Sequence, residues 1–140
     1  MLHTVVLTTD GHVFQWGFLC SDEEQQVGVV PVSFLTGSRN DSEKERIIQI
    51  ACGEFHALAL TAKGQVYSWA SWISKTDGVL GTGPHVDGKG PFKISGTNGF
   101  DSRISQIACG GCTSYALDNE GDVSGALSSC SSCYYRRLHD

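Results

Sequence analysis

Residues 46–53 read RIIQIACG, and the pattern returns at residues 103–110 as RISQIACG. The two copies begin 57 positions apart and share 11 identities over their first 24 positions. A further partial copy lies near the N-terminus, where residues 3–17 match residues 56–70 at 6 of 15 positions. This near-regular spacing indicates a protein built from internal repeats.

Each copy has the residue pattern of short β-strands. In residues 46–52 large apolar side chains alternate with polar or small ones, which is the period of a half-buried strand. A short polar turn follows in each copy, and these turns end at Gly11, Gly64 and Gly121. Glycine suits such a turn because it adopts a left-handed conformation cheaply. We therefore expect an antiparallel sheet over residues 46–94, with hairpin turns at Lys63–Gly64 and Asn119–Gly121.

The number of strands in each repeat predicts the fold class. Four short strands in about 55 residues make one blade of a β-propeller. We expect an all-β protein, an incomplete propeller of about two to two and a half four-stranded antiparallel blades. The predicted segments are an incomplete first repeat (1–45), a complete repeat (46–102), the start of a third repeat (103–123) and a non-repeat tail (124–140). Because the pattern begins inside a blade and is lost after Val123, we expect a piece of a longer propeller.

The residues of the repeat resemble a known family. Residues 51–69 follow A-C-G-x-x-H-A-L-A-L-T-x-x-G-x-V-Y-x-W, with a Gly-rich loop downstream at residues 78–83. This pattern closely resembles the regulator of chromosome condensation repeat, and the likeness covers roughly residues 3–123. The resemblance implies a seven-bladed propeller that serves as a platform for protein partners. It also implies that the founding type exchanges guanine nucleotide on the small GTPase Ran.

Charge and composition argue against two classes of partner. The net charge is −5, and Arg136 and Arg137 are the one adjacent basic pair, so no basic stripe exists for nucleic acid. No apolar run reaches the ~18–20 residues of a membrane span, so no membrane is expected as a partner. The N-terminus lacks the pattern of a signal peptide. We therefore interpret the six cysteines as reduced thiols of a cytoplasmic or nuclear protein.

Two functions remain open from the sequence. No GxSxG elbow is present, and no Cys–His pairing stands outside the repeat pattern, so we expect no enzyme and no cofactor. The favoured function is a non-enzymatic protein-interaction scaffold. The alternative is a guanine-nucleotide exchange factor for a Ran-like small GTPase, although the protruding element of such factors is not found in these blades. Open blade edges would also allow self-association.

Four cysteines have the spacing of a zinc site but carry another interpretation. They form two C-x-x-C pairs, Cys109 with Cys112 and Cys130 with Cys133. Paired thiolates can close a tetrahedron around zinc. The repeat already accounts for Cys109, however, because Cys52 occupies the same position in the preceding copy. We therefore predict no bound metal.

Residues 83–90 nearly spell a phosphate-binding loop. The position that should be Ser or Thr is Gly90, and Pro91 follows where the motif needs a helix. We interpret the segment as a loop between strands that binds no nucleotide.

Histidine and tryptophan recur at fixed repeat positions. His3 and His56 are equivalent, and we predict that they contact a protein partner; the alternative is a ring bonded to the adjacent A-C-G turn. Trp16 and Trp69 are expected to pack the blades, whereas Trp72 is a candidate for exposure to a partner.

Overall fold

The structure is a computed structural model, and it describes residues 3–17, 30–31, 46–54, 56–70, 91–94, 103–111, 113–127 and 136–138. These residues form strands and turns, and none of them lies in a helix. Within these ranges, accordingly, no helix has the length and hydrophobicity to cross a membrane.

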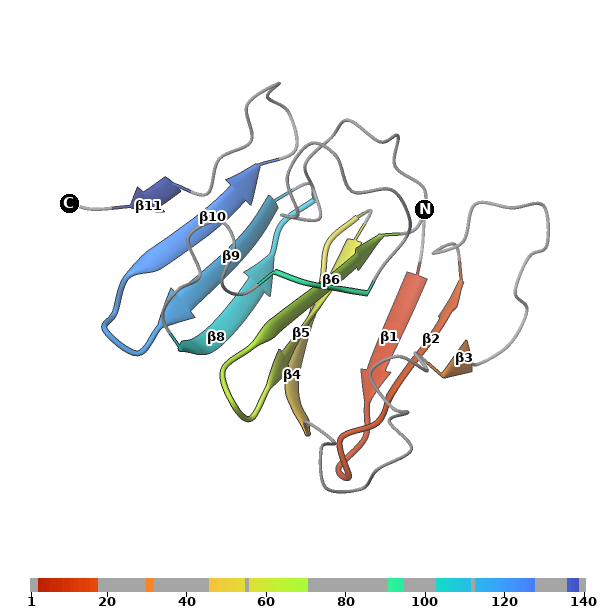
Figure 1. Cartoon of the computed structure of the whole chain (residues 1–140). Helices are drawn as coiled ribbons and strands as arrows, with labels where there is room; N and C mark the ends of the chain where they lie inside the picture. Colours follow the sequence, from red (N-terminus) through yellow and green to blue (C-terminus); the bar gives the residue numbers. More distant parts are fainter. Residues whose placement is uncertain are drawn as a thin grey trace.

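The strands form three antiparallel sheets that lie side by side (Figure 1). The first sheet has the order β1 (His3–Leu7), β2 (Val13–Gly17) and β3 (Val30–Pro31). The second has the order β4 (Ile47–Cys52), β5 (His56–Thr61), β6 (Val66–Ala70) and β7 (Phe92–Lys93). The third has the order β8 (Ile104–Cys109), β9 (Thr113–Asp118), β10 (Val123–Leu127) and β11 (Arg136–Leu138). The predicted all-β partial propeller is confirmed.

The sequence repeat corresponds to a strand order that recurs from sheet to sheet. β1, β5 and β9 occupy equivalent places, and so do β4 and β8 at the margins of their sheets. β4 pairs with β5 and β8 with β9 with the same shift of register, between Ile47 and Gln49 and between Ile104 and Gln106. Among the described residues, the first sheet has no strand at the place of β4.

The predicted hairpins are confirmed. β5 and β6 are joined through Gly64, whose φ is 81°, and β9 and β10 through Gly121, whose φ is 92°. Both angles lie in the left-handed region, which a residue with a Cβ adopts at a cost of ~1–2 kcal/mol.

The third sheet extends beyond the predicted boundary at residue 123. β10 pairs with β9 from Val123–Leu117 to Leu127–Thr113, and β11 pairs with β10. Residues 124–127 and 136–138, which were predicted as a non-repeat tail, therefore pair with the third sheet, and the described strands form one three-stranded and two four-stranded sheets. Backbone groups make the ladder between strands, so the sheet continues where the side-chain pattern of the repeat has been lost.

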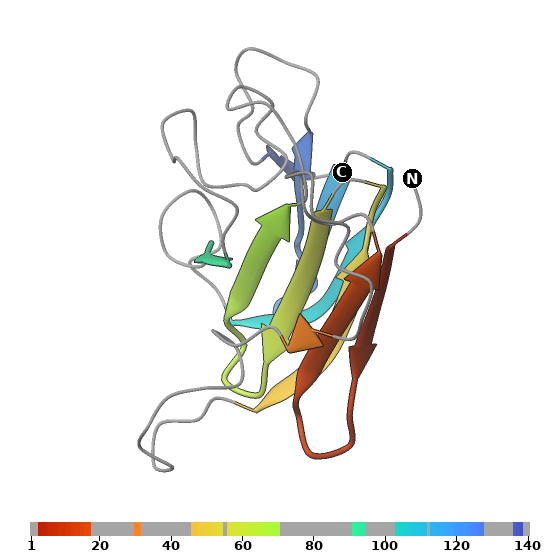
Figure 2. The ribbon, with the colours of Figure 1, turned by 90° about the vertical axis from the view of Figure 1, so that its right-hand side faces the viewer.

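The core consists of two apolar clusters between neighbouring sheets. We call the space between sheets one and two the first seam; its buried residues are Val13, Ile47, Ala57, Ala59 and Trp69. We call the space between sheets two and three the second seam; its buried residues are Leu58, Leu60, Val66, Ile94, Ile104, Ile107 and Ala116. All six residues of β5 are buried, because its alternating side chains fill both seams. Figure 2 shows the strands of the first sheet (red) beside those of the second sheet (yellow to green).

Candidate functional site

One histidine of the repeat lies inside the second seam. The His56 ring is fully buried, and its Nε2 lies 2.8 Å from the Oγ of Ser114, which is 1% exposed. A Cβ on Gly53 would lie 2.6 Å from His56 Cε1 and 2.5 Å from the Gly110 carbonyl oxygen. Only glycine therefore fits between the ring and the neighbouring blade. The ring packs on the A-C-G turn, and its hydrogen bond crosses the seam.

The same environment keeps His56 neutral. Burial and, to a smaller extent, the positive charge of His3 together lower the pKa of His56 to about 4. A serine bonded to a neutral histidine has the geometry of a nucleophile with its base. Here, however, Ser114 is closed to substrate, and His56 Nδ1 has no hydrogen-bond partner to orient the ring. The pair therefore joins two blades and does not form an active site.

His3 stands at the equivalent place in the first sheet and is half-buried. Its Nε2 is buried without a partner, since Ala57 occupies the repeat position of Ser114 and has no hydroxyl. Burial lowers the pKa of His3, and the N-terminal charge lowers it as well. A partner contact by His3 and His56 remains a prediction, and for His56 such contact would require the seam to open.

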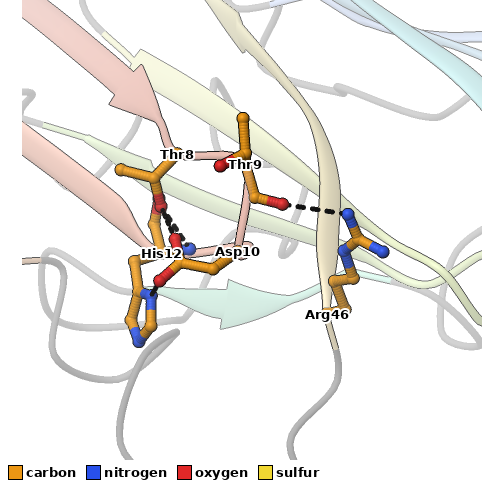
Figure 3. A network of polar contacts seen from close by, with 5 residues as sticks. All are labelled: Thr8, Thr9, Asp10, His12 and Arg46. Carbon is orange, nitrogen blue, oxygen red and sulfur yellow. Dashed lines mark hydrogen bonds and ion pairs between the residues drawn. The ribbon is translucent and has the colours of Figure 1, made fainter.

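An arginine joins each pair of neighbouring blades at the hairpin end. Arg46 donates from Nη2 to the Thr9 carbonyl at 2.9 Å, and Arg103 donates from Nη2 to the Ala62 carbonyl at 3.0 Å. The two bonds occupy the same repeat position. Figure 3 shows the Arg46 side chain reaching from the start of β4 to the turn between β1 and β2.

The turn that receives Arg46 is fixed by its own polar groups. The Thr8 hydroxyl accepts the His12 N–H at 3.0 Å, and it also bonds the Asp10 carboxylate (Figure 3). Asp10 Oδ2 lies 2.8 Å from His12 Nδ1 at the exposed tip. The hydrogen bond from Thr8 lowers the pKa of Asp10. These contacts hold the Thr9 carbonyl in position for the arginine.

A glutamine joins the second and third blades at their inner strands. Gln49 donates from Nε2 to the Ile107 carbonyl at 2.9 Å and accepts the Ile107 N–H at 3.1 Å on its Oε1. Both outward-facing backbone groups of Ile107 are therefore satisfied by one side chain. The equivalent residue in the third blade is Gln106, which is exposed.

The repeated tryptophans differ in their surroundings. Trp69 is 3% exposed and donates from Nε1 to Gln15 Oε1 at 2.9 Å across the first seam. Trp16, at the same repeat position, is 37% exposed. Trp69 therefore packs the blades, whereas Trp16 presents an apolar ring at the surface. Trp72 lies outside the described residues.

The predicted zinc pattern is only partly within the described residues. Cys109 and Cys52 are free cysteines. Burial raises the pKa of Cys109 to about 12, with Cys52 adding to the effect, so the thiol stays protonated and is a poor metal ligand. Cys112, Cys130 and Cys133 lie outside the described residues, as does the loop at residues 83–90. The absence of a metal therefore remains a prediction.

One acidic cluster has its oxygens within 4.8 Å of one another in the described part of the chain; it consists of Asp118, Glu120 and Asp122. Asp118 Oδ1 accepts the N–H groups of Glu120 and Asp122 at 2.9 Å each. The carboxylate thus shapes the hairpin turn, as the hydroxyls of Thr8 and Thr61 do in the other two blades.

Sequence reasoning missed the polar groups that join the blades. Gln49, Arg46 and Ser114 carry these contacts, and none of them was predicted as a functional residue. The shared R-x-x-Q of both copies was the available signal, because the fixed spacing of two polar residues in an otherwise apolar strand suggests a contact that the fold repeats.

Sequence comparisons decide the family. Two sequence models described as the regulator of chromosome condensation (RCC1) repeat match residues 47–69 and 63–117. The chain belongs to the regulator of chromosome condensation repeat family. The matched residues include the strands of the second blade and, of the third, β8 and all of β9 except its last residue.

Curated relatives of this RCC1-repeat chain have different names and are much longer. The mitochondrial RCC1 domain-containing protein RUG3 of Arabidopsis thaliana is 31% identical over 86% of the chain, which covers 27% of RUG3. The ultraviolet-B receptor UVR8 of the same plant is 32% identical over 88% of the chain, again 27% of the relative. The probable E3 ubiquitin-protein ligase HERC6 of Homo sapiens is 31% identical over 82% of the chain and 11% of its own length. The chain thus spans about a quarter or less of these relatives.

Solved structures share the fold. Prp20p from Saccharomyces cerevisiae, described with its binding properties to Gsp1p and histones, has a TM-score of 0.72 and 20% identity. Human WBSCR16 has a TM-score of 0.69 and 22% identity. The chain is covered to 99% in both comparisons and covers 34% of Prp20p and 37% of WBSCR16. At these identities the likeness establishes the arrangement of blades.

Proposed function

We propose that this chain is a non-enzymatic protein-interaction segment of a propeller. The proposal rests on where two kinds of side chain lie: polar groups are bonded between the blades, and large apolar groups are exposed at the surface. The Ser114–His56 pair is buried inside a seam, and both polar atoms of the Gln49 amide bond the Ile107 backbone. Large apolar side chains stay exposed instead, namely Val6, Trp16, Ile48 and Tyr115. Exposed apolar and aromatic groups on a rigid frame suit protein binding.

The relatives support a binding role in general terms. The RCC1-repeat family includes a receptor, a ligase and an RCC1-domain protein among the relatives of this chain. Prp20p is described with binding to Gsp1p and histones, and yeast RCC1 (Prp20) as bound to Kap60. We therefore propose a protein partner, of which a Ran-like small GTPase is one candidate. The free thiols of Cys52 and Cys109 suit a cytoplasmic or nuclear setting.

The two repeat histidines enter this proposal in different ways. His3 is half-buried on the strand at the margin of the first sheet, so we propose that it contacts the partner directly. His56 is enclosed by Gly53 and Ser114 and therefore acts by holding the blades that carry the surface.

The test compares binding with exchange. Ran loaded with a fluorescent guanine nucleotide is mixed with the full chain, and nucleotide release and complex formation are followed together. We expect unchanged release and at most weak binding, because exchange needs a broad pre-organised interface of about 20–30 residues a side. His3→Ala should weaken any binding, and the matched variant His12→Ala, at an exposed turn, should not.

The contrary result is a many-fold acceleration of release at micromolar chain that His56→Ala abolishes. That outcome would establish an exchange factor and contradict the scaffold.

A further inference from the structure

The aromatic residues of β6 on the side of the first seam have no aromatic counterpart at the second seam. Trp69 belongs to the buried core of the first seam, and Tyr67 lies on the same face of the strand. The third sheet has Ser124 and Ala126 at these two repeat positions. The register supports both equivalences: Tyr67 pairs with Ala59, Trp69 with Ala57, Ser124 with Ala116 and Ala126 with Ser114. Two large aromatic residues are therefore replaced by serine and alanine.

The other residues of the second seam do not make up for this loss. Five apolar positions are the same at both seams: Leu7, Val13, Ile47, Ile50 and Ala59 correspond to Leu60, Val66, Ile104, Ile107 and Ala116. Three positions change from Val5 to Leu58, from Val32 to Ile94 and from Ala57 to Ser114, and each change adds one heavy atom. These small gains replace little of an indole and a phenol ring, although protein interiors are normally close-packed.

Hydrogen bonds between the blades oppose closure of the second seam over the missing rings. The same arginine contact joins the blades at both seams, at 2.9 Å from Arg46 and at 3.0 Å from Arg103, so the blades are spaced alike at the hairpin end. The second and third sheets lie side by side (Figure 1), and the bond between His56 and Ser114 joins them at 2.8 Å. A closer approach of the two sheets would disturb these bonds.

A buried hydroxyl in the second seam has no hydrogen-bond partner. Ser68 is fully buried, and its Oγ makes no hydrogen bond within the part of the chain that the structure describes. At the first seam the same repeat position is Gln15, whose Oε1 accepts the Nε1–H of Trp69 at 2.9 Å. The third sheet has Ala126 at the position of Trp69, so it supplies no indole N–H to Ser68. Buried polar groups nearly always have a partner, and the first seam shows which group serves at this position.

We propose that the second seam binds an indole ring between β6 and β10, and that the Ser68 Oγ accepts the indole N–H. The ring takes the place that the Trp69 side chain has at the first seam. Replacing a large buried side chain by a small one leaves room for a small aromatic molecule in other protein cores. The ligand is a free indole compound or the tryptophan side chain of another protein, because both have the same ring and the same N–H. The inference goes beyond the proposed function and does not depend on it.

The first test titrates the full chain into a fluoroindole and follows the ligand by fluorine NMR. We expect saturable binding. The N-methylated form of the same fluoroindole has no N–H and should bind about tenfold more weakly, because it leaves the Ser68 hydroxyl without a partner. If neither compound binds saturably, a segment of the chain itself or water lies at Ser68, and the proposal is wrong.

A serine variant tests the role of the hydroxyl. Ser68→Ala removes the acceptor, so the two fluoroindoles should bind the variant with equal affinity. The matched variant Ser105→Ala removes a hydroxyl that bonds the Leu117 and Asp118 carbonyls within the third sheet, and it should keep the preference for the N–H compound. A preference that survives Ser68→Ala would overturn the proposal. A merely structural role of Ser68 would change both affinities together and would not remove the preference.

Filling the site from within the chain gives an independent measurement. Ala126→Trp restores the repeat residue at the second seam, so it should raise the melting temperature and abolish fluoroindole binding. Glu120→Trp, which adds the same ring at an exposed turn, should leave both unchanged. Undiminished binding to a folded Ala126→Trp chain would place the ligand elsewhere and contradict the proposal. If that variant does not fold, the comparison at Ser68 still decides.

Competition distinguishes the two sources of the ring. Indole and N-acetyltryptophanamide are each added to the complex with the fluoroindole. Displacement by both supports the tryptophan side chain of a protein as the ligand, because the amide includes the backbone on either side of the ring. Displacement by indole alone supports a free indole compound. Displacement by neither would show that the fluorine probe binds outside the indole site, and the proposal would be wrong.

Discussion

At the scale of single residues, the second seam contains one polar pair within an apolar core. His56 is fully buried, and Ser114 bonds its Nε2 at 2.8 Å. The ring must stay neutral there, because a buried imidazolium without a counter-charge is strongly disfavoured. Protonation of His56 is therefore unfavourable as long as the second and third blades remain packed around the ring.

This linkage predicts a loss of stability in mild acid. The pKa of His56 is lowered from 6.5 to about 4 in the folded chain. Above pH 6.5 the residue is neutral in both states, and as the pH falls towards 4 the unfolded state takes up a proton that the folded state does not. The free energy of unfolding should then fall by up to about 3 kcal/mol. Denaturant titrations at several pH values between 7 and 4 would measure this decrease in the free energy of unfolding.

Two variants separate this effect from general acid sensitivity. His56→Gln should remove most of the pH dependence in that window, and His12→Gln, at the exposed turn, should retain it. A stability that is flat with pH in the unsubstituted chain would contradict the assignment.

At the scale of elements, side chains of one blade form hydrogen bonds with the backbone of the neighbouring blade. The Gln49 amide makes two hydrogen bonds to Ile107 and so ties β4 to β8. An arginine ties the start of the same strand to the preceding hairpin, at Arg46 and again at Arg103. Among the described residues, the arginine contact therefore recurs at both seams, whereas the glutamine contact is made at the second seam alone.

The matched glutamines predict a large difference between two otherwise similar variants. Gln49→Ala should destabilise the chain by about 1–3 kcal/mol, because the Ile107 N–H and C=O lose their partner in a partly buried seam. Gln106→Ala changes the equivalent but exposed residue and should have an effect within about 0.5 kcal/mol. Thermal denaturation of the two variants side by side measures the difference. Equal destabilisation would show that the amide contact does not hold the seam.

The elements themselves were largely predictable, and the seam contacts were not. Period-two alternation and the glycine of each turn predicted the strands from Ile47 and from Ile104 and the hairpins at Gly64 and Gly121. β10 and β11 lay beyond the predicted repeat, since backbone pairing needs no side-chain signature. The bond from His56 to Ser114 joins residues 58 positions apart. The sequence alone does not show which residue of the next blade lies beside His56, because that depends on how the two sheets pack.

At the scale of the whole molecule, the three sheets are not equally supported. The second sheet packs against a neighbour on both faces, and every residue of β5 is buried. In β1 the residues alternate between half-buried and exposed, and in β9 Tyr115 is 39% exposed. Stability in a stacked array is approximately the sum of each unit and its interfaces. The middle blade, with two interfaces, should therefore be the last to open.

Hydrogen exchange tests this order on three equivalent strands. β2, β6 and β10 each lie between two strands of their own sheet, so differences in their exchange reflect support from the neighbouring blades. We expect amides of β6 to exchange slowest, by about tenfold or more relative to β2 and β10. Gln49→Ala should accelerate exchange in β10 and leave β2 unchanged, because the substitution loosens the second seam alone. Identical rates in all three strands would instead mean that the chain opens as a single cooperative unit, with the seams no weaker than the sheets they join.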